Sequence, residues 1–176
     1  MREIGDDKLS GFTYYKPGTY TQAGSGAFGV NSEKFRYTFQ KLNGDGEIIS
    51  RVSMLENTGN SSRVGVMIRE SLASNARHVF LGLSGKGTFL HIERKTTGGK
   101  NATSRQGIGR VPNTWLRLLR KGNVITAYKS TNGRKWIMVA RVELKLRRNG
   151  YIGLVTASGS NTKLNISLFG NVKARP

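Results

Sequence analysis

Tryptophan and arginine alternate with leucine in the segment TWLRLLRKGN, residues 114–123, and this spacing has a chemical use. Successive side chains of a strand point to opposite faces, so Leu116 and Leu118 share one face and Trp115 and Arg117 share the other. A guanidinium binds carboxylate, sulfate or phosphate oxygens, and an indole ring stacks on the C–H face of a sugar. The pattern indicates a core face and a face able to read an anionic ligand. The alternative is that Trp115 packs in the core or against a hairpin.

A second segment, VGVMIRESL at residues 64–72, has the same alternation. Its apolar residues at every second position predict a buried face, which leaves Arg69 on the opposite face, followed by Glu70. Two interpretations of Arg69 stay open. It pairs with a carboxylate such as Glu93 and bridges a sheet to a loop, or it binds an anionic ligand together with other basic residues.

Charge is the strongest feature of the composition. The sequence has 29 Lys and Arg residues against 10 Asp and Glu residues, a net charge of +19. Residues 1–93 hold 11 basic and 9 acidic residues, a net of +2, whereas residues 94–176 hold 18 basic residues and only Glu143, a net of +17. Such a charge attracts polyanions, which are anionic polysaccharides, nucleic acids or anionic lipid surfaces. The alternative is an adaptation for solubility.

Length and composition limit the class of protein. We expect one domain over residues 1–176, and 36% hydrophobic residues with 23 glycines and 3 prolines are typical of a globular fold with many tight turns. No apolar segment approaches the roughly 20 residues of a membrane-spanning helix, and none follows Met1 and Arg2 as a secretion signal would. The absence of cysteine excludes disulfides, thiol catalysis and Cys-ligated zinc.

Apolar alternation recurs along the chain without a helical period, which predicts an all-β fold of two packed sheets. About eleven strands are expected, at residues 11–16, 34–42, 46–55, 62–70, 77–84, 88–94, 114–122, 123–130, 135–144, 151–158 and 163–174. The Asn132-Gly133 pair predicts a tight hairpin turn. The polar, glycine-rich segment 96–107 is expected to be a mobile loop.

The hairpin around SGKG, residues 84–87, is predicted in more detail. If Leu83 pairs with Thr88, then Leu81 faces Leu90 in a core layer. The opposite face then carries a polar and aromatic set, as expected where a sheet meets solvent or a ligand. That set is His78, Phe80, Phe89, His91 and Glu93.

The motifs GDGEI, GVMIRE, WLRLLRKGN, YKSTNGRKW and YIGL occur in this order over nearly the whole chain. In this order they resemble the concanavalin A-like lectin/glucanase jelly roll, and within it the laminin-G-like modules of the regulation-of-enolase type. The resemblance implies a jelly-roll sandwich of two antiparallel sheets, one of them concave. It also implies a module appended to secreted or surface proteins of bacteria, with a role in carbohydrate binding.

Two departures from that family concern metal binding. Its members usually carry Asp-Gly before the tryptophan of the late hairpin, where this chain has Asn132-Gly133. They also carry an Asp-rich segment where this chain has AFGVNSEKF, residues 27–35. Calcium needs carboxylate or carbonyl oxygens, so we assign no metal site and no cofactor.

Catalytic constellations are not found. Glycoside hydrolases need two carboxylates on either side of the scissile bond, but no Glu-x-Asp-x-x-Glu strand occurs, and the acids are scattered from Asp6 and Asp7 to Glu143. A polysaccharide lyase would need a base such as His91 or His78, with Tyr128 and Arg117 near it, but the strand motifs of those enzymes are missing. We therefore expect a protein that is not an enzyme.

The expected ligand-binding residues belong to strands whose non-core faces would meet on the concave sheet. They are Arg51, Arg69, His91, Trp115, Arg117 and Lys129. A contiguous basic rim is expected from the turns of the C-terminal half. Its residues are Arg120, Lys121, Arg134, Lys135, Lys145, Arg147 and Arg148.

These observations favour an extracellular or cell-surface module that binds an anionic polysaccharide or another polyanion without catalysis. Nucleic acid is a less favoured partner, because few aromatic residues lie among the basic turns and no helix for groove entry is predicted. The alternatives are a structural component of a surface layer, filament or capsid and, less favoured, a polysaccharide lyase.

Overall fold

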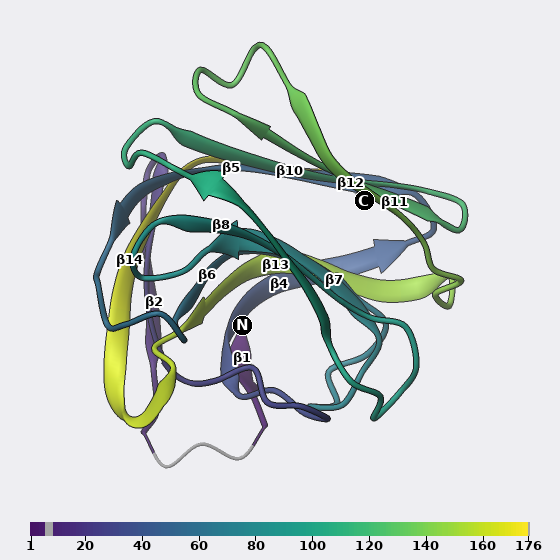
Figure 1. The fold of residues 1–176 in the computed structure, drawn as a ribbon, viewed down its shortest axis with the longest axis horizontal. Coiled ribbons are helices and arrows are strands. Elements are labelled where there is room, and N and C mark those ends of the chain that lie inside the picture. Colours follow the sequence, from purple (N-terminus) through teal and green to yellow (C-terminus); the bar gives the residue numbers. More distant parts are fainter. Residues whose placement is uncertain (6–8, 176) are drawn as a thin grey trace.

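The computed structural model describes residues 1–5 and 9–175, and its regular elements are all strands. Two seven-stranded antiparallel sheets pack face to face (Figure 1). β5, β10 and β11 of sheet B lie across the top of the view and β14 and β2 run down one side, while sheet A lies beneath. The expected all-β sandwich is confirmed. Asp6 and Asp7 lie outside the described residues.

The strands of sheet A, in spatial order, are β1 (Arg2–Ile4), β4 (Phe35–Asn43), β13 (Asn149–Ala157), β6 (Arg63–Arg69), β7 (His78–Leu83), β8 (Thr88–Arg94) and β9 (Ala102–Ile108). Those of sheet B are β12 (Ile137–Glu143), β11 (Val124–Ser130), β10 (Thr114–Lys121), β5 (Gly46–Leu55), β14 (Ser160–Arg175), β3 (Thr19–Gly26) and β2 (Phe12–Lys16). Every pair of neighbouring strands is antiparallel.

All eleven predicted strands are present, and β1, β3 and β9 are additional. The prediction of a loop at 96–107 is wrong for its second half, because residues 102–108 form β9 at the edge of sheet A. An edge strand that packs on one neighbour needs no apolar alternation, and most of β9 is exposed. Its sequence ATSRQGI therefore carries no strand signal of the kind that marks buried strands.

The main core lies between the sheets and follows the predicted alternation. Val64, Val66 and Ile68 of β6 belong to one buried cluster with Leu116 and Leu118 of β10. Fully burying side chains of this size stabilises the fold by about 1.5–3 kcal/mol each. The core faces of these two strands are therefore as the sequence predicted.

The β7–β8 hairpin is shifted by one residue from the predicted register. Leu83 pairs with Phe89 rather than with Thr88. The connection between the paired residues Leu83 and Phe89 holds one residue more than expected: Ser84 N–H donates to Thr88 O over 2.9 Å, and Gly87 adopts a positive φ of 80°. A one-residue shift moves side chains to the other face, so Phe89, His91 and Glu93 lie on the side of β8 that faces sheet B.

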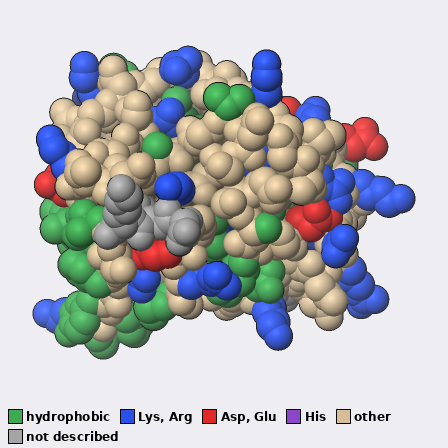
Figure 2. Space-filling view, turned by 90° about the horizontal axis from the view of Figure 1, so that it is seen from below, with side chains coloured by type: hydrophobic (Ala, Val, Ile, Leu, Met, Phe, Trp, Pro, Cys, Tyr) green, Lys and Arg blue, Asp and Glu red, His purple; other side chains and the backbone are tan. Residues whose placement is uncertain are grey.

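A second apolar cluster covers the outward face of sheet A, the face turned away from sheet B. It includes Phe35, Tyr37, Met67 and Phe80, which are fully buried. Figure 2 views the molecule from this side, where side chains and backbone from the connecting segments cover the sheet. This face of sheet A is therefore closed over most of its area by the chain itself.

Two buried arginines hold the covering segments in place. Arg69 Nε donates to Ser71 O over 2.6 Å, and its Nη2 donates to Ala73 O. The Arg94 guanidinium donates to Ser74 O and Val30 O, each over 3.3 Å. Both arginine side chains are fully buried, so their charges act on loop carbonyls and not on solvent.

Arg94 also forms a buried ion pair. Its Nη2 lies 2.6 Å from Glu33 Oε1, and neither side chain is exposed. Burial raises the pKa of Glu33 to about 7, although Arg94 acts in the opposite direction. His78 Nδ1 lies 3.8 Å from Glu33 Oε2. Because burial lowers the pKa of His78 to about 3, this imidazole is neutral and donates from Nδ1 to Ala76 O.

We predict that Arg94→Gln lowers the free energy of unfolding by about 3 kcal/mol near pH 8, because it leaves a buried carboxylate unpaired. Between the usual pKa of 4.5 and the folded value of about 7, Glu33 is more protonated in the folded chain than in the unfolded chain. Its contribution to the free energy of unfolding therefore falls as pH rises through this window. Losing Arg94 raises the folded pKa further. The deficit of the variant therefore grows from about pH 5 to about pH 8.

Urea unfolding at both pH values measures this deficit. Lys95→Gln is the matched control, because it removes a neighbouring cation from the exposed pair that Lys95 makes with Glu93 at 3.3 Å. It is expected to change stability by about 0–1 kcal/mol at either pH. An equal deficit for both variants, or one independent of pH, would contradict the role given to Glu33.

Candidate functional site

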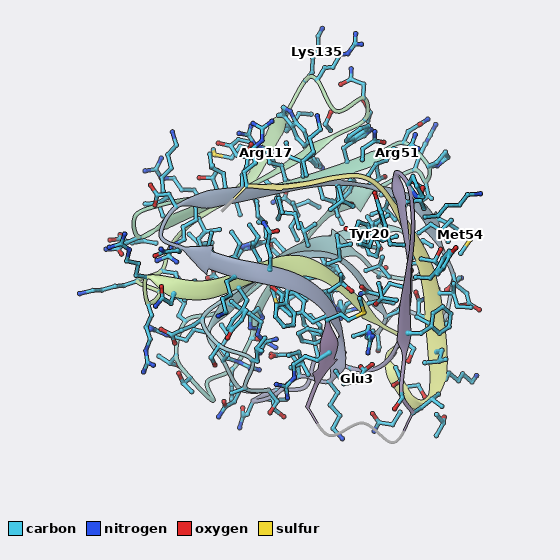
Figure 3. The ribbon with its side chains drawn as sticks, turned by 180° about the vertical axis from the view of Figure 1, so that it is seen from behind. Glu3, Tyr20, Arg51, Met54, Arg117 and Lys135 are labelled. Atoms are coloured by element: carbon cyan, nitrogen blue, oxygen red, sulfur yellow. The ribbon has the colours of Figure 1, made fainter. Side chains whose placement is uncertain are left out.

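The turn between β11 and β12 is pinned by its own side chains. Asn132 Oδ1 accepts the backbone N–H groups of Arg134 (2.9 Å) and Lys135 (3.0 Å). Ser130 Oγ accepts those of Asn132 (3.2 Å) and Gly133 (3.0 Å). Figure 3 shows Lys135 at the tip of this hairpin, which projects beyond sheet B. The predicted hairpin at Asn132-Gly133 is present and preorganised, but its connection spans the six residues 131–136 and is not the tight turn that was expected.

Trp115 lies directly beneath that turn. Gly133 has a φ of +70°, and a Cβ on it would lie 2.9–3.0 Å from atoms of the Trp115 ring. Trp115 is only half-buried, but this ring face is covered by the turn. Trp115 therefore packs against the hairpin, as in the alternative stated above, and is not an exposed platform on which a sugar could stack.

A cleft of about 660 Å³ opens beside the turn, and we call it the hairpin cleft. It lies where the β8–β9 edge of sheet A meets β10, β11 and β12 of sheet B. Its lining residues are Phe89, Ile108, Gly109, Arg110, Asn113, Thr114, Lys129, Ser130, Thr131, Asn132, Lys135 and Ile137.

Lys129 is the most enclosed cation of the hairpin cleft. Its Nζ lies 4.7 Å from the centre of the Phe89 ring and donates to Gln106 O over 3.2 Å. Gln106 Nε2 in turn donates to Val139 O over 2.9 Å, which ties β9 to β12 at the side of the cleft. The described lining contains Lys129, Lys135 and Arg110 but no Asp, Glu or His, so its charge is uniformly positive.

Three of the predicted ligand-binding residues gather on the outward face of sheet B, where Figure 3 shows Arg51 and Arg117. Trp115 pairs with Arg51, whose Cζ lies 5.9 Å from the centre of the indole. Arg117 pairs across the strands with Tyr128, and its Cζ lies 5.4 Å from that ring. Arg117 Nη2 also lies 2.7 Å from Glu47 Oε2. The Glu47 carboxylate therefore neutralises part of the positive charge on this face.

The other three predicted ligand-binding residues lie elsewhere, so the prediction of one shared concave face is wrong. Arg69 is buried under the loops of sheet A, and Lys129 pairs with the core residue Leu116, which puts it on the side between the sheets. The predicted pairing of Arg69 with Glu93 is also wrong, because Arg69 donates to loop carbonyls. The alternation of β6 and β10 was predicted correctly, but it does not reveal which strands share a sheet.

His91 is nearly buried and has a lowered pKa, with burial as the main cause. Its Nε2 lies 4.0 Å from Glu93 Oε2 and has no hydrogen-bond partner among the described residues. The one-residue shift of the β7–β8 hairpin explains this position. His91 therefore faces the space between the sheets and not the surface where a ligand was expected.

The predicted basic rim is divided. Arg120 is buried and donates to the carbonyls of Leu146 (3.0 Å), Arg147 (3.0 Å) and Gly122 (3.1 Å), so including it in the rim was wrong. The remaining rim residues are exposed but lie at opposite ends of β11, roughly 20 Å apart for a strand of this length. Arg134 and Lys135 lie at the end with the hairpin cleft, and Lys121, Lys145, Arg147 and Arg148 lie at the other end.

Positive charge is spread over the face that Figure 2 shows. On the face shown in Figure 2, Lys and Arg side chains project around the whole outline, with few acidic groups among them. Net charge alone therefore attracts a polyanion without selecting a face. A defined site needs concave shape and enclosed donors, and the hairpin cleft provides both.

Two further searches of the described residues bear on function. Within residues 1–5 and 9–175, no group of three or more His, Cys, Asp and Glu side chains is arranged to hold a metal ion. In the same part of the chain, no helix is long and apolar enough to cross a membrane.

Several solved structures share the fold. A functionally unknown protein from Saccharomyces cerevisiae has a TM-score of 0.77 at 14% identity, with 98% of this chain and 94% of that chain covered. A prokaryotic β-1,3-1,4-glucanase (lichenase) from a mouse hindgut metagenome has a TM-score of 0.64 at 12% identity, over 93% and 83%. The carbohydrate-binding module CBM66 from Bacillus subtilis has a TM-score of 0.56 at 13% identity, over 95% and 92%.

At such low sequence identities, these similarities show the fold alone. It is the concanavalin A-like jelly roll that the sequence predicted. No known protein family and no curated protein sequence matches the chain. Function therefore has to be argued from the site itself.

Sequence reasoning identified only Lys129 and Lys135 among the residues of the hairpin cleft. The others come from four separate segments around Phe89, Ile108, Asn113 and Ser130, and no local pattern marks them as neighbours. The one available signal was the Asn-Gly turn, since a turn rigid enough to be predicted is also a suitable wall for a site.

We predict that Gly133→Ala lowers the free energy of unfolding by about 2–4 kcal/mol, because it combines a left-handed backbone with overlap on Trp115. Gly122→Ala is the matched control. Gly122 also has a positive φ, of 57°, but a Cβ on it would meet nothing within 4 Å. The control should lose only about 1 kcal/mol. Denaturant unfolding followed by tryptophan fluorescence measures both, and equal losses would show that Trp115 does not support the turn.

Proposed function

We propose that this chain is a non-catalytic module that binds an anionic polysaccharide in the hairpin cleft. The observation that carries the proposal is the composition of the cleft: cations, uncharged polar groups and apolar side chains line one concavity, without a carboxylate among the described lining residues. A neutral sugar would not need three cations, and a simple anion would not need apolar walls.

Each class of side chain suits one part of an acidic sugar. The ammonium groups of Lys129 and Lys135 attract carboxylate or sulfate groups, and the enclosure of Lys129 against Phe89 strengthens that attraction. Side chains such as Asn113 and Thr114 supply donors and acceptors for sugar hydroxyls. The apolar surface of Ile137 supports the C–H face of a pyranose ring.

The size of the hairpin cleft fits a short stretch of chain. Its volume of about 660 Å³ falls within the roughly 300–1,000 Å³ of typical ligand pockets. The surrounding positive charge would hold the rest of a long polyanion loosely, in a manner that weakens as salt is added. The outward face of sheet B is a weaker candidate, because Glu47 neutralises Arg117 and the turn covers Trp115.

The shared fold of the Bacillus subtilis carbohydrate-binding module supports carbohydrate as the ligand class. Within the concanavalin A-like group, the order of GVMIRE, WLRLLRKGN and YIGL supports a laminin-G-like module of the regulation-of-enolase type. The proposal includes an extracellular or cell-surface location, since that resemblance implies modules appended to exported proteins.

The absence of catalysis is part of the proposal. Hydrolysis of a glycoside needs two carboxyl groups about 5–10 Å apart, and the described lining of the hairpin cleft supplies none. A lyase would need a base near the uronate, and His78 is buried and neutral while His91 faces the space between the sheets.

We predict that the double variant Lys129→Gln/Lys135→Gln binds polygalacturonate or dextran sulfate about tenfold more weakly than the wild type, because two enclosed or adjacent cations are lost. Affinity electrophoresis in gels containing each polymer measures this, with neutral dextran as the reference. Added salt should weaken the wild-type retention.

Two control variants make the result specific. Lys16→Gln/Lys163→Gln removes the same charge from exposed positions outside the cleft, and its affinity should change less than about twofold. Arg51→Gln/Arg117→Gln tests the outward face of sheet B. A larger loss from either control than from the cleft variant, or equal wild-type retention on neutral and anionic gels, would refute the proposal.

We also predict no release of unsaturated uronate products. The wild type is incubated with polygalacturonate and alginate, and ultraviolet absorbance of the unsaturated product is followed over time. Absorbance should not rise above that of a heat-denatured sample. A steady rise that His91→Gln abolishes would establish a lyase and overturn the non-catalytic proposal.

A further inference from the structure

A second pocket lies on the outward face of sheet A, and we call it the Arg63 pocket. Its volume is about 250 Å³, and it shares no lining residue with the hairpin cleft. The lining residues are Phe28, Gly29, Val30, Arg63, Ile92, Lys100, Asn101 and Thr103. It is one of the parts of this face that the loops leave open.

The strand register explains how Arg63 enters this pocket. Ile92 pairs with Thr103 on β9 and with Phe80 on β7, so all three side chains share the outward face. Arg63 lies further along β6 on the same face, and the outward positions next to it are Gly65 and Gly82, which pair with each other. These glycines contribute no side chain, which leaves room on the face for the long side chain of Arg63.

The charge of Arg63 is not compensated by the protein. Its Nη1 donates to Asn60 O and Ser62 O, each over 2.7 Å, while its buried Nε has no partner. No carboxylate of the described residues lies within ion-pair distance of it. The nearest charged influence is another cation, Arg105, which together with burial lowers the pKa of Arg63. Lys100 adds a further positive charge at the pocket wall.

Asn101 lines the same pocket. Its Nδ2 donates to Gly29 O over 3.1 Å and to Glu33 Oε1 over 3.2 Å, which fixes the orientation of the amide. Its Oδ1 is buried and has no hydrogen-bond donor among the described residues. A buried acceptor without a donor destabilises the fold by about 1–3 kcal/mol, so a ligand hydroxyl that reaches it gains affinity. The Thr103 hydroxyl is a further polar group of the wall.

We propose that the Arg63 pocket binds a single acidic sugar residue, with the carboxylate facing Arg63 and Lys100 and a hydroxyl facing Asn101. Phe28 and Ile92 form the apolar wall for the C–H face of the ring. The volume, below the roughly 300–1,000 Å³ of larger ligand pockets, fits one residue and not a chain. The site is independent of the proposed function of the hairpin cleft, because the two sites lie on different surfaces.

Amide NMR titration of the full chain with D-galacturonate tests the proposal. We expect saturable shifts centred on residues 28–30 and 100–103, and none of that pattern with D-galactose, which lacks the carboxylate. Arg63→Gln should weaken binding at least about tenfold, as for a lost hydrogen bond to a charged group. A titration with trigalacturonate distinguishes two sources of the ligand. The same shifts would indicate that the pocket binds the end of a polysaccharide chain. Their absence would indicate that it binds a free sugar acid.

Lys100→Glu keeps the test decisive if Arg63→Gln is unstable, because Lys100 is exposed and its replacement should weaken binding without changing the melting temperature. The cleft variant Lys129→Gln/Lys135→Gln should bind galacturonate like the wild type, so failure of one proposal is distinguishable from failure of the other. The proposal is overturned by equal shifts with acetate, by shifts centred on the hairpin cleft, or by unchanged binding in Lys100→Glu.

Discussion

The constraint on which this molecule depends is the set of buried guanidiniums on the outward face of sheet A. Arg69 and Arg94 bind carbonyl groups of the segments around Ala73 and Val30, and Glu33 balances the charge of Arg94. A buried charge is tolerated only when it is paired and fully hydrogen-bonded. The loops therefore cannot leave the sheet without exposing these groups or leaving them unpaired, and most of the outward face of sheet A stays covered.

This closure determines where a ligand can bind. A sandwich of two sheets offers two outward faces and the openings at its edges. Loops cover most of one face, and on the other Arg117 is paired with Glu47 and Trp115 packs beneath Gly133. What remains are the openings on the face of sheet A, such as the Arg63 pocket, and the edges, where segments from both sheets meet without a neighbouring strand. The hairpin cleft is such an edge, and its polar groups are held by a turn whose shape is fixed by Asn132.

The sequence predicted the core faces of β6 and β10, because an alternation such as that of Val64, Val66 and Ile68 is a local property. It did not predict which faces meet, because that depends on pairing between distant segments. The register of β7 and β8 was missed by one residue, since the connection between the partners Leu83 and Phe89 is one residue longer than the four residues of SGKG. β9 was missed because an exposed edge strand needs no apolar pattern.

The basic residues also divide into buried and exposed groups that the sequence does not distinguish. Arg120 and Arg134 look alike in a sequence, yet the first binds three carbonyl groups inside the fold and the second is exposed. Arginine serves both roles because its planar group satisfies several acceptors at once. Counting charges therefore yields a hypothesis about the kind of partner, whereas locating a candidate site requires the three-dimensional pairing of strands.

The hydrogen bond from Gln106 of β9 to Val139 of β12 affects how copies of the molecule behave at high concentration. An open strand at a sheet margin is a template on which another copy can add its own strand, and such addition leads to aggregation. Here the backbone of β9 turns through a positive φ at Gly107, a charged Arg105 stands on the strand, and Gln106 fastens it to the opposite sheet. Copies of the chain at high concentration would therefore remain separate molecules and not add to one another through β9.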